Sequence, residues 1–263
     1  MKRKLPFILL LILSLTACNG GRSDRPQSIT VFAASSLTDA FNELAQAFEA
    51  QNEGGEVILN YAGSSQLAAQ LREGVTADVF ASANPTQMKA VVEAGRIEAG
   101  TEVIFVSNRL TIIVPDDNPA GITALEELAQ PDIQLILAVE GVPVRAYIDD
   151  IVGAMPADFQ EQFYANLVSE EDNVRQVSAK VALGEADAGI VYSSDVTPGS
   201  PVQQIAIPDA QNLVAAYPIA PLADAPNPEL ARRFIAFVLG PEGQTILSKW
   251  GFDPLLPVSS IIY

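Results

Sequence analysis

The chain has 263 residues, 49% of them hydrophobic, and its 32 acidic against 15 basic residues give a net charge of −17. This excess of negative charge excludes a nucleic-acid partner, because the phosphate backbone would repel it. Histidine is absent and Cys18 is the only cysteine, which excludes a Ser-His-Asp triad and most zinc or copper sites.

Residues 1–17 are predicted to be a signal peptide. Three basic residues open the chain, and the apolar run that follows is too short to span a bilayer. Leu15, Thr16 and Ala17 stand directly before Cys18, as in a bacterial lipobox, which predicts cleavage before Cys18 and a lipid on it. An ordinary signal peptide with a stray thiol is the alternative. Residues 18–27 are polar and Gly-rich and are expected to form a tether from the membrane.

The stretch 29–50 is the clearest structural unit. Its apolar start predicts a strand over 29–34, and apolar residues from Leu37 to Phe48 then recur at three and four residues, which predicts a helix over 37–50. Ser36, with Asp39 three residues on, is a capping signal. The free N–H groups of a helix start can bind an anion, although a serine that only caps the helix is the simpler interpretation.

The same strand–turn–helix plan returns along the chain. Strands are predicted at 56–61, 78–82, 135–139 and 188–192, and helices at 66–72, from 85, at 145–153, at 174–184, at 228–239 and up to Trp250. The alternation predicts an α/β protein with largely parallel sheets. Long apolar strands near 104–114 and 213–222 predict two lobes joined by crossing strands. Lobe I is expected over 28–109 and 218–263, and lobe II over 110–217.

Hydroxyl-bearing turns fall at the predicted strand ends, where α/β sheets bind their ligands. The polar groups gathered there are Ser35, Ser36, Ser64, Ser65, Tyr192 and the N–H groups that open the helices near Val144 and Val174. They are neutral and nearly all can donate hydrogen bonds, which suits a ligand that only accepts, such as a fully deprotonated oxyanion. A phosphate that still carries a proton would also need an acceptor.

Seven segments in this order resemble the molybdate-binding proteins of bacterial ABC importers (the ModA family). The segments are Val31–Ala40, Tyr61–Leu67, Ala77–Ala83, Gly141–Val144, Asn173–Val177, Gly184–Tyr192 and Gly240–Gly243. The resemblance, which runs from about Ser28 to Phe252, implies a two-lobe periplasmic-binding-protein fold that holds a tetrahedral oxyanion between its lobes without counter-charges. Carried over by motif, the ligand groups are the hydroxyls of Ser36, Ser64 and Tyr192 and the N–H groups of Val144 and Val174.

Arg145 departs from the family pattern, which usually has a small residue after the Val-Pro-Val turn. Its side chain either adds a charge-assisted contact to the anion or points outward and pairs with Asp149. Ser35 is a further candidate, because the residue pattern alone does not separate it from Ser36. Acidic pairs such as Asp116-Asp117 are expected to be solvated loops and not catalytic carboxylates.

The resemblance implies a lipid-anchored solute-binding protein, not an enzyme, that captures molybdate and also tungstate and delivers it to an ABC permease. No cofactor and no bare metal ion are expected, since the molybdenum is bound within its oxyanion. A monomer, exported to the cell envelope, is the expected form. The alternatives are a binding protein for a sulfate-like oxyanion or a small organic acid, a lipid-anchored enzyme, and a structural lipoprotein. The chain shows neither a nucleophile with its base nor a metal cluster for an enzyme.

Overall fold

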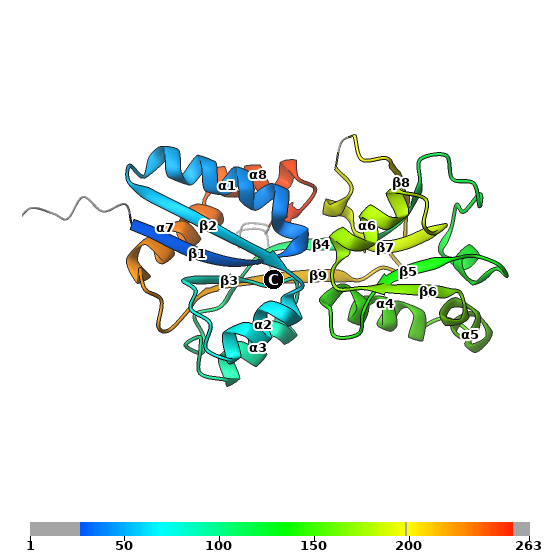
Figure 1. Cartoon of the computed structure of the whole chain (residues 1–263), viewed down its shortest axis with the longest axis horizontal. Helices are drawn as coiled ribbons and strands as arrows, with labels where there is room; N and C mark the ends of the chain where they lie inside the picture. The colour runs from blue at the N-terminus through cyan, green and yellow to red at the C-terminus, as the bar shows by residue number, and fades with distance from the viewer. Residues whose placement is uncertain (1–26, 198, 255–263) are drawn as a thin grey trace, which may run out of the picture.

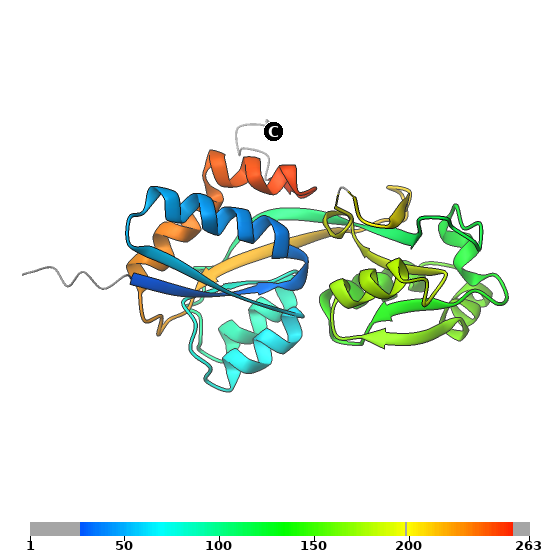
Figure 2. The same ribbon diagram turned by 45° about the horizontal axis from the view of Figure 1, so that its top comes forward.

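The computed structural model describes residues 27–197 and 199–254, which form two α/β lobes joined by two long strands (Figures 1 and 2). The predicted signal peptide, Cys18 and almost all of the predicted tether lie outside these residues. None of the helices in the described ranges has the length and apolar character needed to cross a membrane.

The first lobe is built on β1 (Gln27–Ala34), which runs parallel to β2 (Gly55–Ala62) on one side and to β3 (Val79–Ala81) on the other. Helices cover both faces of this sheet (Figure 1). They are α1 (Thr38–Gln51), α2 (Ser64–Arg72), α3 (Pro85–Glu93), α7 (Pro228–Leu239) and α8 (Pro241–Lys249). The apolar face of α1 is buried as predicted, with Phe41 and Phe48 edge-to-face against Phe234 of α7.

The second lobe is built on β5 (Leu135–Ala138), which runs parallel to β6 (Leu167–Glu171) and to β7 (Ala188–Tyr192). Its other elements are α4 (Pro143–Gly153), α5 (Ala157–Ala165), α6 (Val174–Ala182) and β8 (Val202–Ala206). The sequence prediction does not contain α5 and β6. The strand β6 lies at the end of the sheet and alternates exposed and half-buried residues, so it lacks the continuous apolar run of a central strand.

The strands β4 (Val103–Pro115) and β9 (Val214–Pro221) connect the lobes. Antiparallel pairing joins β4 to β9 up to Arg109 and to β7 and β8 from Leu110 onward. A two-residue strand, β10 (Asp253–Pro254), also pairs with β4. The polar residues that interrupt the apolar run of β4 do not break the strand, because Asn108 is buried and hydrogen-bonded to Ser194 at 2.8 Å.

The predicted α/β fold class is confirmed, and the parallel units within each lobe are as expected. Each sheet also contains antiparallel pairs, because the crossing strands enter from the other lobe against the direction of the local strands. The residue limits of the two lobes stay a prediction.

Candidate ligand-binding site

The turns after four parallel strands come together where the two lobes face each other. At the start of α6, Arg175 Nε donates to the carbonyl of Ser35 at 3.3 Å, which links the turns after β6 and β1. A Cβ atom added to Gly63, after β2, would lie 2.7 Å from the carbonyl oxygen of Asp172 and 3.7 Å from a methyl group of Val142. The junction between the lobes is therefore closely packed, and it contains the carboxyl ends of these strands.

Ser36 is not the helix cap that the sequence predicts. Residues Ser35–Leu37 form a 3₁₀ turn, η1, that runs directly into α1, so Leu37 takes the cap position and no side chain caps the helix. The capping prediction is wrong because the N–H of Thr38 already continues the turn by donating to the Ser35 carbonyl. The hydroxyl of Ser36 instead lies 3.0 Å from the hydroxyl of Tyr217, and both residues are buried.

Ser64 is the first residue of α2, and Gly63 before it has no side chain that could cap the helix. The hydroxyl oxygen of Ser64 accepts a hydrogen bond from the backbone N–H of Ala83 at 3.0 Å, and the residue is 1% exposed. A hydroxyl has one proton besides its acceptor lone pairs. The proton of Ser64 is therefore available to a further partner.

Two helix starts supply buried backbone N–H groups. Pro143 opens α4 and has no N–H, so Val144 provides the first N–H group of that helix. At the start of α6, the carboxamide of Asn173 accepts from the N–H groups of Arg175 and Gln176, and this cap leaves the N–H of Val174 unused. Both valines are buried.

Tyr192 ends β7 and is completely buried, yet its hydroxyl has no hydrogen-bond partner among the residues that the structure describes. Burial raises the pKa of Tyr192 well above its ordinary value, so the phenol keeps its proton. Its ring packs edge-to-face on that of Tyr217, with centroids 5.5 Å apart, which places it beside the Ser36 contact. A buried hydroxyl without a partner is costly, and a ligand that accepts its proton would remove that cost.

Arg145 turns away from this cluster. Its Nε donates to Asp149 at 2.8 Å, and its Nη1 donates to Glu170 at 2.5 Å and to the carbonyl of Ala138 at 3.3 Å. Burial alone would lower the pKa of Arg145, but hydrogen bonds to the two carboxylates raise it above its ordinary value. Of the two orientations that the sequence leaves open, the structure has the one paired with Asp149.

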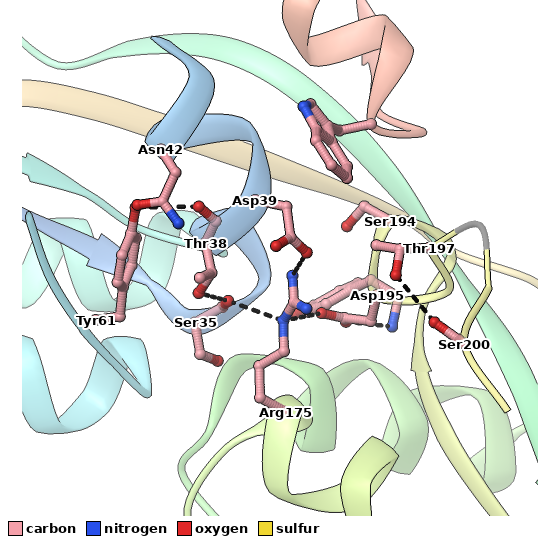
Figure 3. A network of polar contacts seen from close by, with 12 residues as sticks. Ser35, Thr38, Asp39, Asn42, Tyr61, Arg175, Ser194, Asp195, Thr197 and Ser200 are labelled. Carbon is pink, nitrogen blue, oxygen red and sulfur yellow. Dashed lines mark hydrogen bonds and ion pairs between the residues drawn. The ribbon is translucent and has the colours of Figure 1, made fainter. Parts of the chain in front are cut away.

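A second arginine, Arg175, bridges the lobes (Figure 3). Its Nη2 donates to Asp39 of α1 at 2.6 Å, and its Nε, besides the Ser35 contact, lies 3.4 Å from a carboxylate oxygen of Asp195. Asp195 belongs to the 3₁₀ turn η3 (Ser193–Asp195), and it also accepts from the N–H of Tyr192 at 3.1 Å. Burial raises the pKa of Asp195 to about 7, and the charge of Arg175 opposes this shift.

Sequence reasoning missed three residues of this neighbourhood, which are Tyr217, Arg175 and Asp195. Arg175 directly follows Val174 in one of the matching segments, so its position beside a ligand candidate could have been noticed. Tyr217 lies in an apolar crossing strand, where an aromatic residue has the pattern of ordinary core.

The donors at the junction are neutral hydroxyl and N–H groups. Within 27–197 and 199–254, no group of three His, Cys, Asp or Glu side chains is arranged to hold a metal ion. The arrangement is suited to a small ligand that accepts hydrogen bonds on several sides.

The family model for bacterial extracellular solute-binding proteins matches residues 29–253. The chain belongs to this family. A curated relative, the molybdate-binding protein ModA of Mycobacterium tuberculosis (strain ATCC 25618 / H37Rv), is 37% identical over 255 residues, which cover 92% of this chain and 94% of that protein. The predicted relationship to the molybdate-binding proteins is therefore confirmed.

Solved structures share the fold of this solute-binding protein. The periplasmic molybdate-binding protein of Azotobacter vinelandii superposes with a TM-score of 0.77 at 18% identity, over 87% of this chain and 99% of that one. The sulfate-binding protein SubI from Mycobacterium tuberculosis H37Rv has a TM-score of 0.77 at 22% identity, over 88% of each chain. The two-lobe fold is thus confirmed, and it is common to proteins named for different oxyanions.

Proposed function

We propose that this solute-binding protein captures a fully deprotonated tetrahedral oxyanion, molybdate and also tungstate, between its lobes and delivers it to the permease of an ABC importer. The buried hydroxyl of Tyr192, which lacks a partner among the described residues, is the observation that carries the proposal. A dianion that offers only oxygen acceptors would complete it. The relative that is 37% identical and named for molybdate supports the choice of anion.

The proposed ligand groups are the hydroxyls of Ser36, Ser64 and Tyr192 and the N–H groups of Val144 and Val174. Such dipoles act on the anion at contact, whereas the acidic surface is screened beyond about 8 Å in physiological salt. Arg145 is left out of the set, because its guanidinium is already held by Asp149, Glu170 and a carbonyl. Ser35 is an additional candidate, because it is buried directly beside Ser36.

In this proposal the lobes enclose the anion, and the permease recognises the enclosed form. The change of partner of β4 between Arg109 and Leu110 supports the predicted limits of 28–109 with 218–263 and of 110–217. The proposal includes export, a lipid on Cys18, a monomeric state and the absence of enzymatic activity and of a cofactor. It is supported by the solute-binding family, in which capture of the ligand and not its conversion is the function.

Thermal unfolding of the chain from Asn19 onward tests this function, with molybdate, tungstate, sulfate, hydrogen phosphate or no anion present. A ligand at a hundred times its dissociation constant stabilises the fold by about 2.7 kcal/mol. We expect molybdate and tungstate to raise the unfolding temperature, and Tyr192→Phe to remove most of that increase while the anion-free temperature changes little. No increase with any anion would overturn the proposal.

A sulfate carrier is the second candidate. It is favoured by the fold match to a protein named for sulfate, and because sulfate is likewise a dianion without a proton. An equal or larger response to sulfate in the same experiment would select it.

A further inference from the structure

The two serine hydroxyls of the proposed site share a feature that neither motif reveals. The oxygen of Ser64 accepts from the N–H of Ala83, and the oxygen of Ser36 lies 3.0 Å from the hydroxyl of Tyr217. The first bond has a fixed direction, because a backbone N–H can only donate. The direction of the second depends on where the proton of Tyr217 lies.

Asn108 of β4 determines that direction. Its side-chain oxygen accepts from the N–H of Arg109 at 2.9 Å, so its amide nitrogen is the group that faces the other neighbours. That nitrogen donates to Ser194 at 2.8 Å, and the Asn108 side chain is also hydrogen-bonded to Tyr217. Since an amide nitrogen only donates, the Tyr217 oxygen accepts from it. The phenol proton is then free to go to Ser36.

The surroundings of Tyr217 keep this arrangement in place. The residue is completely buried, and its ring packs edge-to-face on Tyr192 and Phe252, each at 5.5 Å, and on Phe105 at 6.5 Å. Burial, followed by the nearby Asp195 carboxylate, raises the pKa of Tyr217 well above its ordinary value. The phenol therefore keeps its proton at any physiological pH.

We propose that Tyr217 is a positioning residue that sets the specificity of the site for the protonation state of the anion, because its hydroxyl donates to Ser36 and thereby directs the Ser36 proton to the ligand. This inference rests on the proposed function. With the oxygens of both serines occupied from within the protein, Ser36 and Ser64 act as donors. A fully deprotonated oxyanion matches them, whereas an oxyanion that carries a proton finds no acceptor in these hydroxyls.

The variant that tests this is Tyr217→Phe, which keeps the ring and its aromatic contacts and deletes the proton. The oxygen of Ser36 then becomes free to accept as well as to donate. Dissociation constants are measured by calorimetry at pH 8 for molybdate and, by displacement of molybdate, for hydrogen arsenate. We expect the molybdate affinity to fall about tenfold, as for the loss of one hydrogen bond, and the affinity for hydrogen arsenate to fall less or to rise. The ratio of the two affinities should shrink at least about threefold.

The matched control is Tyr61→Phe, which removes a phenol of the same lobe that bonds the carbonyl of Thr38 and the side chain of Asn42. Both affinities should stay within about twofold of the wild type. A double-mutant cycle adds a second readout: if Tyr217 acts through Ser36, then Ser36→Ala with Tyr217→Phe should bind molybdate no more weakly than Ser36→Ala alone.

Three results would overturn the inference. Two are an unchanged ratio with unchanged affinities and a loss of equal factor for both anions, which would mean that Tyr217 only supports the packing. The third is an additive double mutant. A wild type that binds no tetrahedral oxyanion would overturn the proposed function itself, whereas a binding wild type with an unchanged ratio in Tyr217→Phe overturns this inference alone.

Discussion

Two arginines occupy equivalent places in the second lobe and have opposite roles in the structure. Arg145 and Arg175 each lie in the first turn of a helix, directly after a valine whose N–H is a proposed ligand group. Arg145 is 6% exposed and binds carboxylates of its own lobe. Arg175 is half-buried and binds Asp39 and a carbonyl of the other lobe.

The difference shows that an arginine beside an anion site is directed by the carboxylates within its reach. Arg145 has Asp149 one helical turn away, and Glu170 lies on the neighbouring strand β6. Arg175 faces Asp195 within its lobe and Asp39 across the junction. Each guanidinium is thus matched by two carboxylates, so neither supplies an uncompensated charge to the junction, and the proposed ligand groups stay neutral.

The largest expected effect is on the acid that serves Arg175. The pKa of Asp195 is about 7 in the folded protein and about 3.9 in an unfolded chain. Folding therefore favours the protonated acid, and stability is lost as the pH rises from about 4 to about 7. Asp195→Asn should remove this loss, which amounts to up to about 4 kcal/mol.

Denaturant unfolding at pH 5 and pH 8 measures it. The difference in stability between variant and wild type should grow with pH and level off above about 7. A difference that is constant, or that shrinks with rising pH, would show that Asp195 is ionised throughout.

The next effect separates the two arginines by holding the lobes apart. In Gly63→Ala the new methyl group would lie 2.7 Å from the Asp172 carbonyl oxygen, so the junction and the Arg175–Asp39 contact must open while the contacts of Arg145 persist. We expect the molybdate affinity to fall tenfold or more, measured by calorimetry. Gly153→Ala is the control, because a Cβ atom there meets nothing within 4 Å. Equal affinities for the two variants would contradict a closed junction.

A smaller loss is expected for Arg175→Gln, which deletes the inter-lobe ion pair. Both partners are about 30% exposed, so the pair is worth roughly 1 kcal/mol, or about fivefold in affinity. The loss should appear as faster dissociation of molybdate, followed by stopped-flow fluorescence. Arg72→Gln, at an exposed arginine of α2, serves as the control. Unchanged dissociation in Arg175→Gln would remove the bridge from the account.

The smallest effect on binding is expected for Arg145→Ala. The molybdate affinity should stay within about twofold, because the side chain is engaged within its own lobe. The unfolding free energy should nevertheless fall by about 1–2 kcal/mol, since Asp149 and Glu170 lose their partner. If affinity fell tenfold with stability unchanged, Arg145 would have to be a ligand.

The elements that were predicted well are those whose signal is local. The helix over Pro228–Leu239 was predicted to the residue, because its apolar positions repeat at helical spacing between a proline and Gly240. The strand β6 was missed because its half-exposed residues carry no apolar run. The cap at Ser36 was predicted wrongly, because the 3₁₀ turn before α1 is not visible in residue types.

The candidate site is predictable only as a set of turns. The segments containing Ser36, Ser64 and Tyr192 are local patterns, and the structure brings their surroundings together. The partners that give these groups their direction come from far along the chain: Tyr217 is 181 residues from Ser36. Such contacts depend on how β9 crosses between the lobes, and no spacing in the sequence encodes them.

The most direct test of a neutral oxyanion site is a crystal structure of the protein with tungstate, whose anomalous scattering locates the metal atom. The account predicts one tungsten peak at the junction, with the anion within hydrogen-bond distance of the hydroxyls of Ser36, Ser64 and Tyr192 and the N–H groups of Val144 and Val174. Both arginines should keep their carboxylate partners. A peak against the guanidinium of Arg145 or Arg175, or none at the junction, would contradict it.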